Sequence, residues 1–95
     1  MDSVKRTIKI HAKDNVVVAL EVLKKNNMIA VGQDIIAVKE DIEKGHKVAI
    51  RNIEKGEDIV KYGFPIGHAT TDIAAGEWVH THNMTTNLDG ILEYT

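Results

Sequence analysis

Apolar and polar positions recur in one short order at several places along the chain. Asp41–Val48, Asn52–Ile59 and Asp72–Val79 each place an apolar residue, a glycine three positions later, and a valine or isoleucine three positions after that. Val22–Ile29 follows the same order, with Asn26 in the glycine position. This spacing is typical of a type I turn that ends in a left-handed residue, a conformation that glycine and then asparagine adopt at least cost. The pattern therefore predicts four turns flanked by short strands, with positive φ at the glycine and asparagine positions.

The segment from Asp14 to Asn27 is open to two interpretations. Asp14 is a good helix cap, and the valines and leucines after it would share one helical face. Three adjacent valines disfavour a helix, because branching at Cβ restricts their side chains there. The turn expected at Asn26 also makes the preceding residues a strand. We therefore favour a strand, and a short helical turn near Asp14 stays open.

Further strands are expected from short apolar runs between turn residues. Thr7–His11 alternates apolar and polar residues, and the runs on either side of Gly32–Gln33 predict a tight hairpin. Val48–Ile50 and Asp58–Val60 complete the set. The sequence thus predicts a compact all-β domain of short strands and glycine turns with little helix.

Length and composition restrict the possible functions. The chain has 95 residues, a net charge of −2 and no cysteine. We expect a single domain spanning residues 1–95, which buries roughly 65% of its unfolded surface and is too small for a deep catalytic cleft. Mixed charges argue against nucleic-acid binding, and the lack of a long apolar run argues against a membrane span. We expect a cytoplasmic domain that acts with a larger partner.

Two histidines near the end of the chain are the first candidate site. His80 and His82 would project from one face of a strand, about 6.5 Å apart, where two imidazoles can share a metal. Trp78 would lie on the same face, with Val79 and Thr81 on the other. No third ligand can be identified, and such a pair is more often structural. We expect this face to be partly exposed, with imidazoles that keep their ordinary pKa.

Two other segments carry candidate residues. Lys61–Gly67 contains the only proline, Pro65, which would stiffen a loop between two glycines. Lys61 at its start could contact a carboxylate as a point charge, or it could be a solvated lysine. His46 directly follows the glycine of the second turn, a position that is often merely exposed.

The repeated D-I-x-x-G units, the segment KYGFPIGHATTDIAAGEWVHTHNMTTNL and the ending GILEYT together resemble a known family. They are similar to the amino-terminal SAF domain, of the β-clip fold, of altronate dehydratases. Galactarate dehydratase and sulfolactate sulfo-lyase belong to the same family. The resemblance covers nearly the whole chain and is strongest from Gly45 onward.

The resemblance implies a role in metal-dependent β-elimination. Enzymes of this family remove water or sulfite from a sugar acid or related hydroxy acid, using a divalent metal, typically iron. The chain would be the small subunit or amino-terminal domain of an altronate-type hydro-lyase that forms a 2-keto-3-deoxy sugar acid. It would help to cover the active site of a larger catalytic subunit or domain, which would hold most of the metal, and would be inactive alone.

The resemblance also suggests roles for individual residues. His80 and His82 become candidate catalytic residues and candidate metal ligands, while Lys61, His46 and Asn83 become candidate contacts of the substrate. The alternative is a non-catalytic binding or assembly module of a related lyase such as sulfolactate sulfo-lyase. Histidines that converge on one face favour the first hypothesis. The sugar acid, the metal and self-association into a homo-oligomer stay open.

Overall fold

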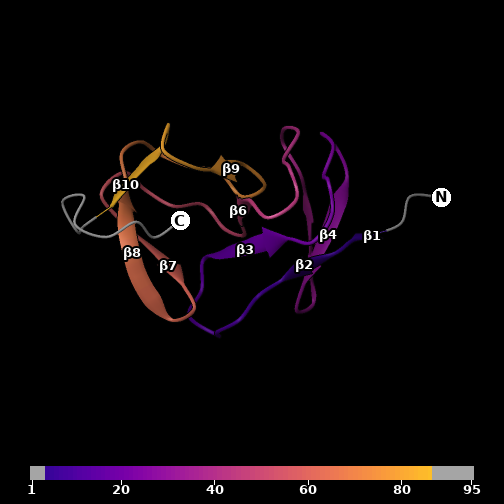
Figure 1. Cartoon of the computed structure of the whole chain (residues 1–95), viewed down its shortest axis with the longest axis horizontal. Helices are drawn as coiled ribbons and strands as arrows, with labels where there is room; N and C mark the ends of the chain where they lie inside the picture. Colours follow the sequence, from indigo (N-terminus) through magenta and orange to yellow (C-terminus); the bar gives the residue numbers. More distant parts are fainter. Residues whose placement is uncertain (1–3, 87–95) are drawn as a thin grey trace.

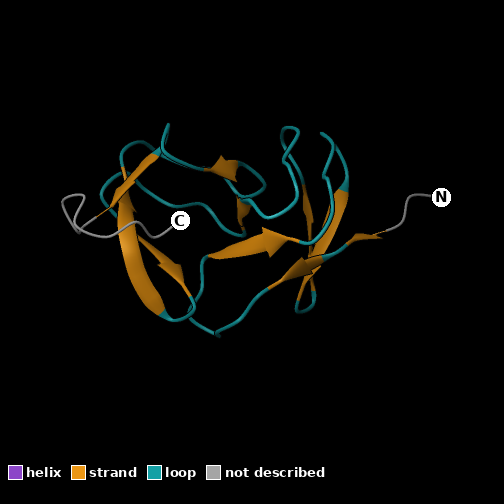
Figure 2. Ribbon diagram, viewed as in Figure 1, coloured by secondary structure: helices purple, strands orange, loops and turns teal. Residues whose placement is uncertain are grey.

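The computed structural model describes residues 4–86, and every regular element in this range is a strand (Figures 1 and 2). None of the described residues forms a helix long and apolar enough to cross a membrane. The strands are β1 (Val4–Lys5), β2 (Thr7–Ile8), β3 (Val16–Ala19), β4 (Met28–Val31), β5 (Asp34–Ala37), β6 (Lys47–Ala49), β7 (Asp58–Lys61), β8 (Phe64–Ala69), β9 (Trp78–Val79) and β10 (Met84–Thr86).

The strands form three small sheets along an elongated body (Figure 1). The four-stranded sheet β2-β3-β6-β9 lies in the middle, with the sheet β1-β4-β5 on one side and β10-β8-β7 on the other. All pairings are antiparallel except that of β1 with β4. The all-β architecture predicted from the sequence is confirmed.

The four predicted turns are present, and they dock in pairs. The backbone φ is positive at each predicted position: 76° at Asn26, 89° at Gly45, 89° at Gly56 and 93° at Gly76. The apolar residues that open the repeats form two antiparallel bridges, in which each partner donates its N–H to the other's carbonyl. The bridged pairs are Leu23 with Ile42, and Ile53 with Ile73.

These pairs give the chain two similar halves. In the first half a repeat leads into the β4–β5 hairpin and then into a second repeat, and in the second half the β7–β8 hairpin occupies the same place. The first hairpin turns at Gly32–Gln33, as the sequence predicts, and the second at Tyr62–Gly63, where both residues have positive φ. The fold is therefore one repeat-hairpin-repeat unit used twice.

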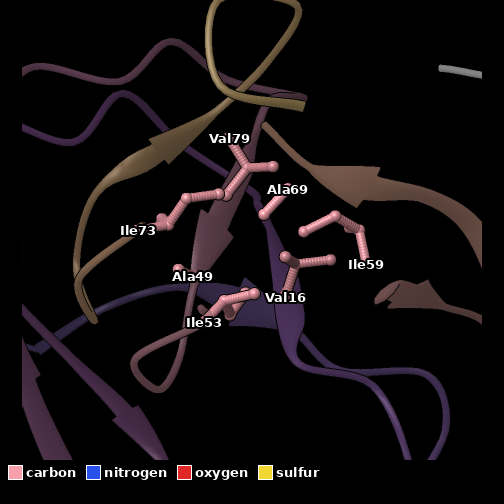
Figure 3. Packing of buried hydrophobic residues seen from close by; sticks show 7 residues of the cluster. All are labelled: Val16, Ala49, Ile53, Ile59, Ala69, Ile73 and Val79. Atoms are coloured by element: carbon pink, nitrogen blue, oxygen red, sulfur yellow. The ribbon is translucent and has the colours of Figure 1, made fainter. Parts of the chain in front are cut away.

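Two apolar cores lie on opposite faces of the central sheet. Alternation along β3 sends Val16 to one core and Val17 to the other, and along β6 it separates Ala49 from Val48 in the same way. Figure 3 shows the first core, where β3, β6 and β9 meet the bridge of the second half. Its buried residues are Val16, Ala49, Ile53, Ile59, Ala69, Ile73 and Val79.

The structure decides between the two interpretations of the segment from Asp14 to Asn27. Val16–Ala19 is a strand, and the residues before it form a single turn in which the Asp14 N–H donates to the carbonyl of His11. Asn15, which is 1% exposed, donates its amide to the carbonyl of Asp58 and accepts from the N–H of Val60. This buried amide therefore ties β3 to β7.

Two expectations from the sequence were wrong in detail. The predicted strand Thr7–His11 ends at Ile8, because only Thr7 and Ile8 find partners in β3. The predicted loop around Pro65 is part of strand β8, at a shift in the register with β7 where Val60 lies opposite the proline. An irregular register tolerates a residue that has no N–H to donate.

We expect two glycines of the repeat to differ in their tolerance of alanine. A Cβ at Gly56 would meet nothing within 4 Å, so Gly56→Ala should cost only the left-handed backbone, about 1–2 kcal/mol. A Cβ at Gly76 would collide with the carbonyl oxygen of Ala37, so Gly76→Ala should cost clearly more. Chemical denaturation of both variants checks this, and equal losses would contradict it.

Candidate functional site

The candidate site lies where the second and fourth repeats meet. Strands β6 and β9 run antiparallel, with Lys47 opposite Val79 and Val48 opposite Trp78. The start of β6 and the end of β9 therefore lie at the same end of the central sheet. This brings His46, which directly precedes β6, next to His80, which directly follows β9.

Three histidine rings surround one indole at this end of the sheet. The ring of His80 stacks on Trp78 at 5.1 Å between centroids, with 10° between the planes. The ring of His82 lies 4.9 Å from Trp78, and that of His46 lies 5.6 Å from it. His46 and His80 are 5.5 Å apart. The three histidines proposed from the sequence thus gather around a single side chain.

A hydrogen bond fixes the form of His46. The indole N–H of Trp78 donates to Nδ1 of His46 at 3.0 Å. Since the indole can only donate, Nδ1 must accept, and the neutral ring then carries its proton on Nε2. Trp78 therefore fixes the ring of His46 and leaves Nε2 as its donor.

The sequence predicted that His80 and His82 lie on an extended strand, and this prediction was wrong. Strand β9 ends at Val79, and the chain then turns back, with the N–H groups of Asn83 and Met84 both donating to the carbonyl of His80. The two rings still contact Trp78 from this turn. The turn forms because the buried amide of Asn83 accepts from the N–H of His80 and donates to the carbonyl of Trp78.

Asn83 therefore has a clear local role. Its side chain is 5% exposed, and both ends of its amide bond backbone groups of its own turn. It shapes the loop that carries the two histidines. Its expected contact with a substrate stays a prediction.

Lys47 is the residue of this site that the sequence analysis missed. It is only 6% exposed, yet no carboxylate within residues 4–86 forms an ion pair with it. Burial, and then repulsion from Lys61, lowers the pKa of its ammonium below the ordinary value of 10.5. Charged groups with a pKa shifted by burial mark candidate functional sites.

The same surroundings affect His80. Burial lowers the pKa of His80 below its ordinary value of 6.5, and the nearby charges of Lys47, His46 and His82 lower it further. The expectation that this imidazole would titrate normally was therefore wrong. The neutral form of His80 is favoured near pH 7, and a neutral imidazole can accept a proton.

Lys61, the other candidate lysine, is the last residue of strand β7. Its ammonium sits 4.9 Å from the centroid of the Tyr62 ring at the tip of the β7–β8 hairpin. It still contributes positive potential, since it is close enough to disfavour the charged form of Lys47.

Two adjoining cavities open beside Lys47 and His80. One of about 160 Å³ is lined by Gly45, His46, Lys47 and His80. The other, of about 250 Å³, is lined by Lys47, His80 and residues of β10 and its flanks. Lys47 and His80 line both cavities, so a small anion placed there would meet both side chains.

The described residues do not form a metal centre of their own. Within residues 4–86 no group of three or more histidine, cysteine, aspartate or glutamate side chains is placed to hold a metal ion. His80 and His82 both pack against the indole of Trp78, and no carboxylate of the described part of the chain joins them as a third ligand. A metal site would need ligands from elsewhere.

Comparison with known proteins places these features in a family. Residues 5–87 match the family described as the altronate/galactarate dehydratase SAF domain. The chain is 48% identical over 91 residues to altronate dehydratase of Bacillus subtilis and 47% identical over 87 residues to altronate dehydratase of Escherichia coli. These matches cover 96% and 92% of the chain, but only 18% of either relative.

A shorter match concerns a lyase subunit. The chain is 45% identical over 49 residues, 52% of its length, to the (2R)-sulfolactate sulfo-lyase subunit alpha of Chromohalobacter salexigens. These residues are also 52% of that subunit, which is therefore about as long as this chain. Comparable segments thus occur both within much longer proteins and in a short subunit.

We expect Lys47→Met to stabilise the chain near neutral pH. The lowered pKa means that the charged form is disfavoured in the fold, and this cost is fully present at a pH below the folded pKa. The unfolded chain releases its proton only near 10.5, so the wild type recovers stability as the pH rises towards that value. The advantage of the variant should therefore shrink at high pH.

Thermal melts of both proteins between neutral and alkaline pH measure this difference. Lys55→Met, at an exposed turn position, is the control and should change little. A Lys47→Met variant that is less stable than the wild type at neutral pH would show that the ammonium has a stabilising partner.

Proposed function

Because the chain belongs to the altronate/galactarate dehydratase SAF domain family, we propose that it is the small subunit or amino-terminal domain of an altronate-type sugar-acid dehydratase. Two findings support this. The altronate dehydratases that it matches are far longer than the matched segment, and the sulfo-lyase relative shows a chain of similar length named as a subunit. The remaining part of such an enzyme would be a larger catalytic domain or subunit.

The observation that carries the proposal is Lys47 beside His80, with no ion pair to its ammonium from any carboxylate among residues 4–86. A sugar acid offers one carboxylate and several hydroxyls. Lys47 would balance the carboxylate charge, and the anion would in turn remove the cost of burying that ammonium. His46, which lines the cavity beside Lys47, would donate its Nε2 proton to an oxygen of the same substrate. Lys61 would add positive potential at longer range.

The proposed reaction is a β-elimination. A base takes the proton from the carbon next to the carboxylate, the electron pair of that C–H bond forms a C=C bond, and the hydroxyl on the next carbon leaves and is protonated to water. The resulting enol becomes the 2-keto-3-deoxy acid. His80 suits a proton transfer in this sequence, since its lowered pKa keeps it neutral and able to accept.

The larger part of the enzyme would supply what this chain lacks. We place the divalent metal, iron by the family resemblance, mainly there, because no group of three or more ligand side chains among the described residues is placed to hold a metal ion. The chain would close over the sugar acid, and Trp78 with its stacked rings would help to exclude water from the cavity.

The rival function is a non-catalytic assembly module, and one observation favours it. Phe64 is 70% exposed and Tyr62 is 48% exposed at the tip of the β7–β8 hairpin, which is an apolar surface suited to a protein partner. Docking through this tip is compatible with the first function. The two hypotheses differ only in whether the histidine and lysine face acts on substrate.

We expect the isolated chain to have no dehydratase activity. It presents one side of a site and no complete metal centre within the described residues. An assay with altronate and Fe(II), with and without the larger part, measures this. Turnover by the chain alone would contradict the division of roles proposed above.

In the complete enzyme, His80→Ala should lower turnover by at least about 10²-fold, the usual contribution of a positioned acid or base. His82→Ala should lower it too, with little change in melting temperature for either histidine variant, and Lys47→Met should chiefly raise KM. His11→Ala, at an exposed histidine outside the ring cluster, is the matched control. An assembly module predicts the reverse, with lower melting temperatures and unchanged turnover per folded molecule.

A further inference from the structure

In three of the four repeated turns, two adjacent backbone N–H groups donate hydrogen bonds to side-chain oxygens. In each, one oxygen comes from the residue that follows the turn and the other from the bridged repeat. The pairs are Lys24 N–H to Asn27 and Lys25 N–H to Asp41, Glu54 N–H to Glu57 and Lys55 N–H to Asp72, and Ala74 N–H to Glu77 and Ala75 N–H to Asn52, at 2.7–3.0 Å.

The second turn breaks this rule at both positions. The corresponding N–H groups belong to Glu43 and Lys44, and no side chain among residues 4–86 accepts from them. The residue after the turn is His46, whose accepting nitrogen already receives the indole N–H of Trp78. The residue on the bridged repeat is Val22, whose side chain has no hydrogen-bond acceptor and which is 51% exposed.

A cavity is lined by the two residues that carry these N–H groups. Its volume is about 610 Å³, against about 390 Å³ for the corresponding cavity of the other half, where Asn52 and Glu77 supply the missing acceptors. The larger cavity is lined by Val22, Lys24, Asp41, Ile42, Glu43, Lys44, His46 and Trp78. Asp41 is paired with Lys24 at 3.8 Å, which leaves Lys44 and Glu43 as opposing charges at the rim.

We propose that the Glu43–Lys44 turn is a binding site for a carboxylate. The chain itself shows that this type of turn accepts one, since the carboxylates of Glu57 and Glu77 bind the corresponding N–H groups. At Glu57, Arg51 and then the Glu54 N–H lower the pKa of the carboxyl, so the turn helps to hold the anion. A ligand carboxylate would use both oxygens on the two N–H groups, and His46 lines the same cavity.

The site does not rest on the proposed dehydratase function. Its carboxylate can come from a sugar acid or from an aspartate or glutamate side chain of a larger partner. Either source would supply the acceptors that the other three turns find within the chain.

Acetate is the simplest probe, and the 95-residue chain is the material. In ¹H–¹⁵N spectra, acetate should shift the amide signals of Glu43 and Lys44 in a saturable way, and acetamide at the same concentration should not. Uniform small shifts over the whole surface, or equal effects of acetate and acetamide, would overturn the proposal.

Two variants that exchange the residues at positions 22 and 52 provide a further test. Val22→Asn copies Asn52, so it should raise the melting temperature and weaken acetate binding at the turn at least about tenfold, because one N–H is then taken. Asn52→Val copies Val22, so it should lower the melting temperature and produce an acetate-dependent shift at Ala75. Undiminished binding by Val22→Asn would overturn the proposal even if Asn52→Val fails to fold.

Two further ligands separate the sources. Altronate that binds more tightly than acetate, with the same two amides shifting, identifies a sugar-acid site. N-acetylglutamate amide that binds more tightly than altronate identifies a contact with a protein side chain. Failure of both to shift Glu43 and Lys44 in the wild type would count against the site, whatever the activity of the complete enzyme.

Discussion

Each repeated turn is held to the rest of the chain by two backbone hydrogen bonds with one buried residue. The turn residue with positive φ donates to the carbonyl of that buried residue, and the buried residue's N–H donates back to the carbonyl of the next turn residue. Strands of two to six residues satisfy few backbone groups, so these exchanges hold much of the fold together. The four exchanges are Asn26 and Asn27 with Val38, Gly45 and His46 with Ala19, Gly56 and Glu57 with Ala69, and Gly76 and Glu77 with Ala49.

The candidate site follows from this docking. The fourth turn docks on Ala49 at the end of β6, which sets β9 beside β6 and brings Trp78 opposite Val48. The second repeat places His46 at the start of the same strand, within hydrogen-bond distance of the indole. The docked turns therefore fix the strands that bring Trp78 and His46 together. A glutamate in place of His46 would satisfy the turn but would leave the indole N–H without its acceptor.

The repeat and its glycine positions could be read from the sequence because turn chemistry is local. Positive φ at Asn26 is the clearest case, since asparagine replaces glycine there for a reason that needs no knowledge of the rest of the fold. The turn after β9 could not be predicted in this way. Its residues include neither glycine nor proline, and it closes through the buried amide of Asn83, whose own carbonyl accepts from the distant N–H of Thr70. Alternation therefore predicted a strand where the chain reverses.

Lys47 escaped notice for a different reason. It follows a turn and a histidine, which is the setting of a solvated lysine, and its burial depends on distant parts of the chain, with β9 paired along β6 and residues of β10 across a cavity from it. Its face of the strand is the face of Ala49, so the fold places an ammonium at the edge of an apolar core.

A chain selected for its own stability alone would carry an apolar residue at this position. The same is true of the second turn, where Val22 leaves a backbone N–H without the acceptor that an asparagine provides in the other half. Both departures cost stability in the isolated chain, and an anion would relieve both. They adjoin the same residue, because His46 lines the cavity beside Lys47 as well as the cavity over the second turn. We therefore infer that this end of the central sheet is shaped for contact with something outside the chain, and that negative charge is what it contacts.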